Sequence, residues 1–205
     1  MTRNRRQNRV SGYDYSQGGY YFVTVCTQDR IEWFGEIKKG EMVLNDIGKM
    51  AHQLWNEIPF YYSGIHLDTF VVMPNHIHGI IIIESSVGTT PCGCPTRNEF
   101  GQTQMFGQTR GSVPTDKLSL SDVISRYKSL VTKKYIDGVR QYNWTAFNKK
   151  LWQRSFYDCI IRNETSLNQI CQYITNNPRQ WDTDIENIKN YGNKNNDVDV
   201  ERFGQ

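Results

Sequence analysis

The sequence has no long apolar run. Across its 205 residues, no segment approaches the roughly 20 consecutive apolar residues that a membrane-spanning helix needs. The N-terminus is charged but lacks a following apolar stretch and cleavage site, so we also expect no secretion signal. Mean hydropathy is −0.64. These absences argue against a membrane protein and predict one compact core with long polar additions.

Cysteine is scarce and unevenly placed. The chain has five cysteines, an odd number, spread over predicted strands, a loop and a helix. That distribution excludes a disulfide framework and indicates a reducing, cytoplasmic setting. Cys92 and Cys94 form a C-x-C motif, but because no second cysteine pair lies near them we expect no zinc site there.

Basic charge is concentrated in two places, although the net charge is only +3. The first ten residues contain four arginines and no acid, and residues 125–154 contain eight lysines or arginines against one acid. This distribution is typical of proteins that bind a phosphate backbone, although a solvated helix face and a frayed tail would give it too. The bases expected to contact DNA are Arg3, Arg5, Arg6, Arg9, Arg126, Lys128, Lys133 and Lys134.

Periodicity and breaker residues divide the chain into an arm, a domain and a tail. We expect a basic arm over 1–19, a domain over 20–182, and an acidic, disordered tail over 183–205. Residues 85–117 are rich in Gly, Thr, Ser, Pro and Gln, which predicts a flexible insertion within the domain. The strands expected are 20–27, 67–73, 76–84 and 152–161, with a small hairpin over 33–37 and 41–44. The helices expected begin after Asn45, Ser119 and Asn163 and end at Pro59, Gly138 and Pro178.

Two histidines interrupt the β-rich segment 71–83, which reads VVMPNHIHGIIII. In an extended strand, side chains two residues apart project from the same face, so His76 and His78 lie side by side, about 7 Å apart at Cα, and Ile77 points the other way. Two imidazoles on one stiff strand can chelate a divalent ion. The spacing equally allows a structural role, in which one histidine packs in the sheet and the other hydrogen-bonds a backbone carbonyl.

The last predicted helix, 164–177, presents a tyrosine off its apolar face. Its buried stripe has the spacing i, i+3, i+4, i+7 and consists of Leu167, Ile170, Cys171 and Ile174. Tyr173 lies about a third of a turn from that stripe. Asn177, four residues later, lies on the same side as Tyr173. Taken alone, this pair is typical of an ordinary surface tyrosine.

Three motifs in order carry a family resemblance: YFVTVCTQDR, VVMPNHIHGIIII, and LWQRSFYDCIIRNETSLNQICQYITNNPRQW. They resemble the HUH-type single-tyrosine transposases of the insertion-sequence-200 kind. Within these, the chain looks most like the REP-associated tyrosine transposases, which carry an N-terminal arginine-rich arm and a closing Tyr-Ile-x-x-Asn-Pro. The resemblance covers residues 3–82 and 118–182 and leaves out the insertion and the acidic tail.

The resemblance implies a role for each matching residue. His76 and His78 match the pair that binds the catalytic metal, Tyr173 the nucleophile, and Asn177 the polar residue that completes the metal site. The implied activity is a single-stranded DNA endonuclease and strand transferase acting on palindromic hairpins. Tyr173 becomes linked to the 5′ phosphate, a 3′-OH is released, and another 3′-OH reseals the strand, so no nucleotide cofactor is needed. We expect Mg²⁺ or Mn²⁺ as the metal rather than Zn²⁺.

The expected fold class is α+β, a ferredoxin-like antiparallel sheet with helices packed on it, as in HUH endonucleases. The expected partner is single-stranded or hairpin DNA; a homodimer is possible, no membrane is involved, and the expected location is the cytoplasm, in association with the nucleoid. Three alternatives stay open: a replication or conjugation nicking enzyme of the same superfamily, a non-catalytic DNA-binding module derived from it, and a metal hydrolase in which Tyr173 has no part.

Overall fold

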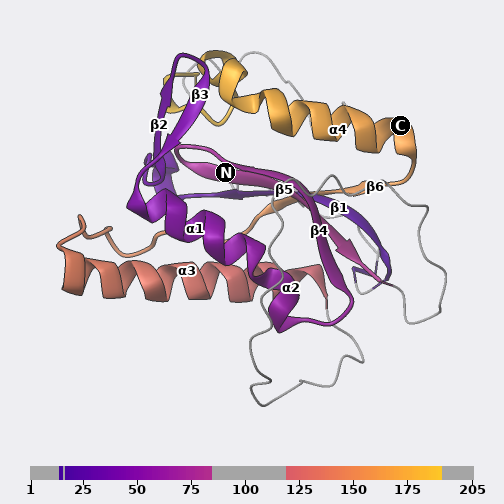
Figure 1. Ribbon diagram of the computed structural model, residues 1–205, viewed down its shortest axis with the longest axis horizontal. Coiled ribbons are helices and arrows are strands. Elements are labelled where there is room, and N and C mark those ends of the chain that lie inside the picture. The colour runs from indigo at the N-terminus through magenta and orange to yellow at the C-terminus, as the bar shows by residue number, and fades with distance from the viewer. Residues whose placement is uncertain (1–13, 16, 85–118, 191–205) are drawn as a thin grey trace, which may run out of the picture.

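A four-stranded antiparallel sheet forms the centre of the protein (Figure 1). The computed structural model describes residues 14–15, 17–84 and 119–190. The sheet has the strand order β4-β5-β1-β6. Its strands are β1 (Gly19–Cys26), β4 (Ile65–Val72), β5 (His76–Ile83) and β6 (Tyr157–Ile161). The strands β2 (Gly35–Lys38) and β3 (Glu41–Leu44) pair separately, as the predicted small hairpin.

The order of the main elements is β1, α1, β4, β5, α3, β6. This is a β-α-β-β-α-β unit whose first and third strands occupy the middle of the sheet, which is the ferredoxin-like arrangement. The helices α1 (Asp46–Asn56) and α3 (Leu120–Tyr142) lie on one side of the sheet, and α4 (Glu164–Asn176) lies on the other (Figure 1). The predicted α+β fold with a helix-backed antiparallel sheet is confirmed.

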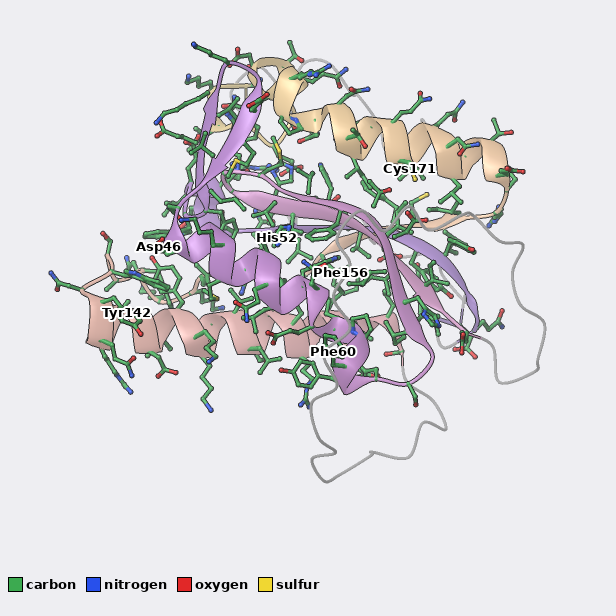
Figure 2. All side chains as sticks on the ribbon, viewed as in Figure 1. Asp46, His52, Phe60, Tyr142, Phe156 and Cys171 are labelled. Carbon is green, nitrogen blue, oxygen red and sulfur yellow. The ribbon has the colours of Figure 1, made fainter. Side chains whose placement is uncertain are left out.

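The sheet is apolar on both faces, as expected of central strands. Because side chains alternate along a strand, one face carries the larger core, which includes Tyr21, Val23, Val25, Ile77 and Ile81 and packs against α1 and α3. On the opposite face, a smaller core is formed by Phe22, Ile80 and Ile161 of the sheet together with Leu167, Ile170 and Ile174 of α4. Figure 2 shows Cys171, which packs against this smaller core, between α4 and the sheet. By the same alternation, the two histidines share the α4 face with Ile80.

The predicted N-caps are confirmed at all three long helices. The side chains of Asn45 and Asn163 accept hydrogen bonds from the backbone three residues later, at 2.9 and 2.8 Å. Ser119 and Asp122 form a reciprocal capping box at the start of α3. The first of these helices ends before the predicted position at Pro59. The helix α1 ends at Asn56, and Pro59 lies inside the short helix α2 (Ile58–Tyr61).

The predicted helix stop at Gly138 is wrong. The helix α3 continues to Tyr142 and ends at Asn143, which adopts the left-handed conformation with φ 57°. Gly138 is required for packing instead, since a Cβ there would lie 2.2 Å from the ring of Trp144. The glycine therefore lets the indole ring lie against the helix.

The predicted strand over 152–161 is shorter in the structure. The strand β6 covers only Tyr157–Ile161, and Trp152 makes an isolated bridge to Thr27. Between them, the ammonium group of Lys128 donates hydrogen bonds to the carbonyl oxygens of residues 153, 154 and 155, at 2.6, 3.5 and 3.3 Å. These bonds hold the segment on α3, and the backbone N–H of Gln153 still donates to β1, at the carbonyl oxygen of Cys26, 3.0 Å away.

Residues 183–190, which the sequence analysis places in a disordered acidic tail, are instead packed onto the domain. They begin at the last residue of the 3₁₀ helix η2 (Asn177–Thr183) and include a second 3₁₀ helix, η3 (Ile188–Asn190). Asp184, Glu186 and Asn187 are buried. A side-chain hydrogen bond from Asn75 to the carbonyl oxygen of Glu186, 2.8 Å long, fastens this segment to the start of β5.

Several sequence predictions fall outside the described residues. They concern the four arginines of the N-terminal arm, the insertion over 85–117 with its two cysteines, and the tail after residue 190. The three cysteines in the described segments form no disulfide. None of the helices described has both the length and the apolar character needed to cross a membrane.

Candidate active site

The strand β5 places His76 and His78 on one face, as predicted. Their ring centroids are 4.4 Å apart, and their exposed fractions are 0% and 3%. Their strand neighbours on β1 are Cys26 and Thr24. Gly79, the next residue, faces the other side, where a Cβ would lie 2.5 Å from the ring of Trp55. The strand that carries the histidine pair is thus packed closely against Trp55 on its opposite face.

Asn75 determines which nitrogen of His76 carries the proton. Its side-chain amide group donates to the carbonyl oxygens of Arg30, at 3.1 Å, and Glu186, at 2.8 Å. Because both amide hydrogens are used there, the amide oxygen accepts, and it lies 2.8 Å from Nδ1 of His76. Nδ1 is therefore the protonated nitrogen, and Nε2 presents a lone pair to the site.

His78 links the strand to the tyrosine on α4. Its Nδ1 lies 2.8 Å from the hydroxyl of Thr24, and its Nε2 lies 3.3 Å from the hydroxyl of Tyr173. The ring of Phe22 stacks on His78 at 5.3 Å and meets the Tyr173 ring edge-on at 6.1 Å. The tyrosine predicted as the nucleophile is therefore half-buried and oriented toward the histidine pair, and not turned to solvent.

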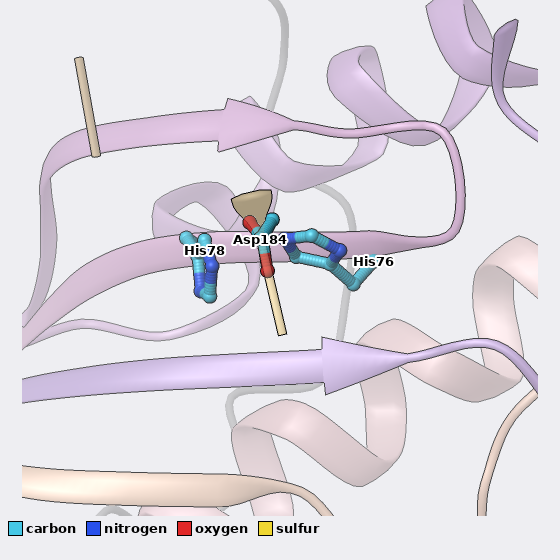
Figure 3. Close-up of side chains that lie close together, drawn as sticks. All are labelled: His76, His78 and Asp184. Atoms are coloured by element: carbon cyan, nitrogen blue, oxygen red, sulfur yellow. The ribbon is translucent and has the colours of Figure 1, made fainter. Parts of the chain in front are cut away.

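Asp184 joins the two histidines in a potential metal site (Figure 3). One ligand atom from each of His76, His78 and Asp184 lies within 4.8 Å of the others, and all three residues are buried. Figure 3 shows the carboxylate between the two imidazole rings. The backbone N–H of Glu186 donates to one Asp184 oxygen at 2.7 Å, and the side chain of Asn177 donates to the other at 2.9 Å.

Two buried polar atoms support the fit of a cation at this point. Among the described residues, neither Nε2 of His76 nor Oδ1 of Asn177 has a hydrogen-bond partner. Both atoms carry lone pairs, and leaving such a group unpaired in the interior costs about 1–3 kcal/mol. A divalent cation would satisfy both atoms together with Asp184. The imidazole, amide and carboxylate donors suit a borderline or hard divalent ion.

The electrostatics keep both histidines neutral. Burial and, to a smaller extent, the positive charge of Arg30 lower the pKa of His76, the Asn177 side chain partly opposes them, and the net result is a pKa of about 3. Burial also lowers the pKa of His78 well below its ordinary value, with a further contribution from His76. Neutral imidazoles are the form that binds metals.

The same surroundings keep Tyr173 protonated. Burial raises its pKa well above 10, and the negative charge of Asp184 raises it further, while a hydrogen bond with Asn177 acts in the opposite direction. Burial likewise raises the pKa of Asp184. The phenol would thus need a positive charge nearby before its oxygen could act as a nucleophile.

The structure brings together all four predicted site residues, His76, His78, Tyr173 and Asn177. It adds Asp184, which the sequence analysis missed because residue 184 follows the predicted domain boundary in an acid-rich stretch. The available signal was Trp181, a large apolar residue just before that stretch; it is 7% exposed and lies 6.0 Å from His76 between ring centroids. The added carboxylate also changes the expected ligand set, which consisted of neutral groups alone.

The basic residues predicted on α3 lie elsewhere. The helix packs on the opposite side of the sheet from α4 (Figure 1), so it does not bring these bases to the histidine pair. Arg126 lies over the ring of Tyr61 at 5.0 Å, and Lys133 and Lys134 are exposed. Lys128 is half-buried, with its ammonium group bound to backbone carbonyls.

The fold and site can be compared with known proteins. No family model matches the chain. The structure is similar to that of a REP-associated tyrosine transposase bound to a REP hairpin, with a TM-score of 0.51 and 18% sequence identity over 88% of this chain and 74% of that one. A crystal structure of a candidate transposase from Deinococcus radiodurans has a TM-score of 0.41 and 17% identity, over 82% of this chain and 95% of that one. The first likeness establishes a transposase-like fold.

A closer sequence relative is found in Haemophilus influenzae (strain ATCC 51907 / DSM 11121 / KW20 / Rd). That protein, described only as uncharacterized, is 35% identical over 185 residues, which cover 88% of this chain and 92% of the relative. Identity at this level over nearly the full length of both proteins shows common ancestry. The chain belongs to the same family as the Haemophilus protein.

Proposed function

We propose that this protein is a metal-dependent tyrosine transposase of the HUH type, acting as a single-stranded DNA endonuclease and strand transferase. The observation that carries the proposal is the 3.3 Å approach of the Tyr173 hydroxyl to Nε2 of His78, beside a cluster of metal-ligand atoms. If the two histidines had only a structural role, this juxtaposition and the unpaired Nε2 of His76 would both have no explanation. The motif resemblance and the transposase-like fold support the same assignment.

Tyr173 would act as the nucleophile. Its oxygen attacks the phosphorus of the scissile phosphate, the bond from phosphorus to the 3′ oxygen breaks, and the 5′ phosphate remains on the tyrosine. The proton lost by the phenol is balanced by the proton that the departing 3′ oxygen gains. The reverse attack by another 3′-OH restores a phosphodiester and the phenol. The number of phosphoester bonds is unchanged in each step, so the reaction needs no external energy source.

The other residues bind and orient. His76, His78 and Asp184 would hold the metal, with Asn177 Oδ1 as a further donor, and Asn75 and Thr24 set the orientation of the two imidazoles. A divalent cation bound here would polarise the phosphoryl oxygens and offset the charge that raises the pKa of Tyr173. We assign Mg²⁺ or Mn²⁺ to this role, because the carboxylate and amide oxygens favour hard ions over Zn²⁺.

The proposed substrate is single-stranded DNA that carries a hairpin. The structurally similar REP-associated tyrosine transposase was solved with a REP hairpin bound, which supports hairpin DNA as the ligand here. A tyrosine on a helix above a sheet reaches an unpaired strand more easily than a duplex, whose phosphates are held on a stiff helix. Homodimer formation and a cytoplasmic, nucleoid-associated location stay predictions.

The proposal can be tested by cleavage of an end-labelled hairpin oligonucleotide with single-stranded flanks, taken from the flanks of the gene itself. We expect cleavage with Mn²⁺ and none with chelator. Tyr173→Phe should abolish cleavage and keep DNA binding, whereas the matched control Tyr142→Phe, at an exposed tyrosine on α3, should cleave normally.

Two rival functions give different results in the same assay, and the third is distinguished by a plasmid nicking assay. A metal hydrolase would keep its activity in Tyr173→Phe. A non-catalytic DNA-binding module would bind the hairpin but leave every oligonucleotide intact with either metal. A replication or conjugation nicking enzyme would cleave a supercoiled plasmid at one origin-like site. Any of these three outcomes would overturn the transposase assignment.

A further inference from the structure

A basic groove lies on the surface of α3, beside the segment that returns from α3 to β6. Its volume is about 510 Å³. Its lining residues include Lys128, Ser129, Thr132, Lys133, Arg140 and Trp152. The groove is on the side of the sheet opposite α4 and the candidate active site (Figure 1). We call it the α3 groove.

The hydrogen-bond donors available in the α3 groove are cationic. The hydroxyls of Ser129 and Thr132 donate to carbonyl oxygens of their own helix, at 2.9 and 2.7 Å. Lys133 and Arg140 are exposed and form no ion pair within the described segments. None of the ion pairs in the described part of the chain joins Asp137, which also lines the groove, to either base. The groove therefore presents net positive charge to an incoming ligand.

Lys128 builds one wall of the α3 groove. Its ammonium group bonds to the carbonyl oxygens of residues 153, 154 and 155, and the indole N–H of Trp152 donates to the Lys128 carbonyl oxygen at 3.1 Å. These bonds fix the returning segment against α3 and place the backbone of Arg154, another exposed base, beside the helix. Lys128 is thus a positioning residue, although its charge still adds to the local positive field.

The basic residues of α3 form a row along one side of the helix. Lys133 and Arg140, which line the groove, are seven residues apart, so they lie on one side of α3 with about 10.5 Å between them. Arg126, seven residues before Lys133, extends this row to about 21 Å but lies outside the groove, over the ring of Tyr61. That length corresponds to about six base pairs at 3.4 Å per step. Nitrogen-tipped side chains project from α3 away from the sheet in Figure 2. Because six base pairs are more than half a turn of a duplex, a row of this length on one face of the duplex meets phosphates of both strands.

The α3 groove is poorly suited to unpaired bases. Strands without secondary structure are held mainly by stacking on exposed aromatic rings. Trp152, the aromatic residue that lines the groove, is 6% exposed and packs against Phe34 and Tyr127 in the core. Phosphate contacts without stacking favour a base-paired stem over a single strand.

We propose that the α3 groove binds the phosphate backbone of the duplex stem of a hairpin, on the side of the sheet opposite Tyr173. The choice of DNA as the polyanion rests on the proposed function. The cut strand then leaves the stem and passes around the sheet to reach α4. Stem binding and strand cleavage are in this way assigned to opposite sides of the same sheet.

The test compares two double variants that each remove two positive charges. Lys133→Gln with Arg140→Gln changes the α3 groove, and Lys38→Gln with Lys49→Gln is the matched control on β2 and α1. For each, the affinity for a labelled duplex and for a single strand of equal length is measured over a range of salt concentrations. We expect the slope of log K against log salt for the duplex to fall by about 1.8 in the groove variant, because each lost phosphate contact removes about 0.9.

The single strand should bind the groove variant and the control equally. Equal slopes for the two variants on the duplex would overturn the proposal, and so would a loss of affinity for the single strand as large as that for the duplex. Circular dichroism of both variants checks that they are folded. The covalent adduct on Tyr173 is measured separately with a short single-stranded oligonucleotide. If the adduct forms but the duplex slopes are equal, the α3 groove proposal fails alone; if no adduct forms, the proposed function fails.

Discussion

The hydroxyl of Tyr173 lies 3.3 Å from Nε2 of His78, a contact between residues 95 positions apart in the chain. It forms because β5 directs the histidine toward the α4 side of the sheet, and α4 places the tyrosine beside its buried stripe. Both ends of the contact are held by packing against Phe22. The contact therefore follows from the packing of β5 and α4 against each other.

The first prediction concerns the two histidines as metal ligands. Replacing either His76 or His78 by alanine should weaken Mn²⁺ binding by more than the 10–100-fold that is typical of losing an outer-shell partner. Isothermal titration calorimetry measures the affinity. His66→Ala is the matched control, because His66 is exposed and bonded to Glu84 on the surface. A comparable loss of Mn²⁺ affinity in the control would contradict the assignment of His76 and His78 as metal ligands.

Asp184 provides the second prediction. Because its carboxylate lies within 4.8 Å of the ligand nitrogens, Asp184→Ala should lower Mn²⁺ affinity at least as much as Asn177→Ala does. Asp182→Ala, at an exposed acid two residues earlier, is the control. Titration of Mn²⁺ followed by electron paramagnetic resonance reports the bound fraction. Unchanged affinity in Asp184→Ala would restrict the site to the histidines and Asn177.

Asn75 should affect metal binding without touching the metal. Asn75→Ala leaves the Nδ1–H of His76 and two carbonyl oxygens without their partner, so we expect Mn²⁺ affinity to fall about 10–100-fold. The same loss should destabilise the fold by about 1–3 kcal/mol for each unpaired group. A variant that is destabilised at a remote position, such as Gly138→Ala, shows how far destabilisation alone lowers the metal affinity. Equal metal affinity in both variants would contradict the role of Asn75.

Gly138→Ala should itself be destabilising, although alanine is normally favoured over glycine in a helix by about 1 kcal/mol. The added Cβ would lie 2.2 Å from the ring of Trp144, and overpacking of this kind typically costs about 1–3 kcal/mol. Urea unfolding at neutral pH measures the difference. A stability equal to or above that of the natural sequence would show that Trp144 can move aside at little cost.

The stability of the metal-free protein should fall as the pH decreases below about 6.5. In the unfolded chain the two histidines have ordinary pKa values, whereas burial lowers the pKa of His76 to about 3 and that of His78 well below 6.5. Between these values the unfolded chain binds protons that the folded chain excludes, so the free energy of unfolding decreases by about 1.4 kcal/mol per pH unit for each histidine. Urea unfolding between pH 7 and 5.5, in chelator, checks this. Replacing both histidines by glutamine should flatten the profile.

Much of the fold could be predicted because local patterns and tertiary packing agree. The strand 20–27 has apolar residues on both faces and became a central strand, and the three caps at Asn45, Ser119 and Asn163 begin helices as expected. The errors arose where a tertiary contact overrides the local signal. Gly138 is explained by Trp144, and the segment before β6 by the ammonium group of Lys128.

Only the site residues that lie on a regular strand or helix could be predicted from the periodicity of the sequence. Strand alternation places His76 and His78 together, and helical spacing places Asn177 one turn after Tyr173. Asp184 could not be found in this way, because it lies outside any regular strand or helix and depends on backbone and side-chain hydrogen bonds to Glu186 and Asn177. The role of Asn75 depends likewise on carbonyl groups that come near it only in the folded chain.

The central claim is that Tyr173 becomes covalently linked to DNA. The most direct measurement is to incubate the protein with a hairpin oligonucleotide and Mn²⁺, isolate the protein–DNA species under denaturing conditions, and map the modified peptide by mass spectrometry. We predict a metal-dependent adduct in which Tyr173 carries the 5′ phosphate of the cleaved strand. A hairpin that binds but gives no adduct, or an adduct on another residue, would contradict the proposed function.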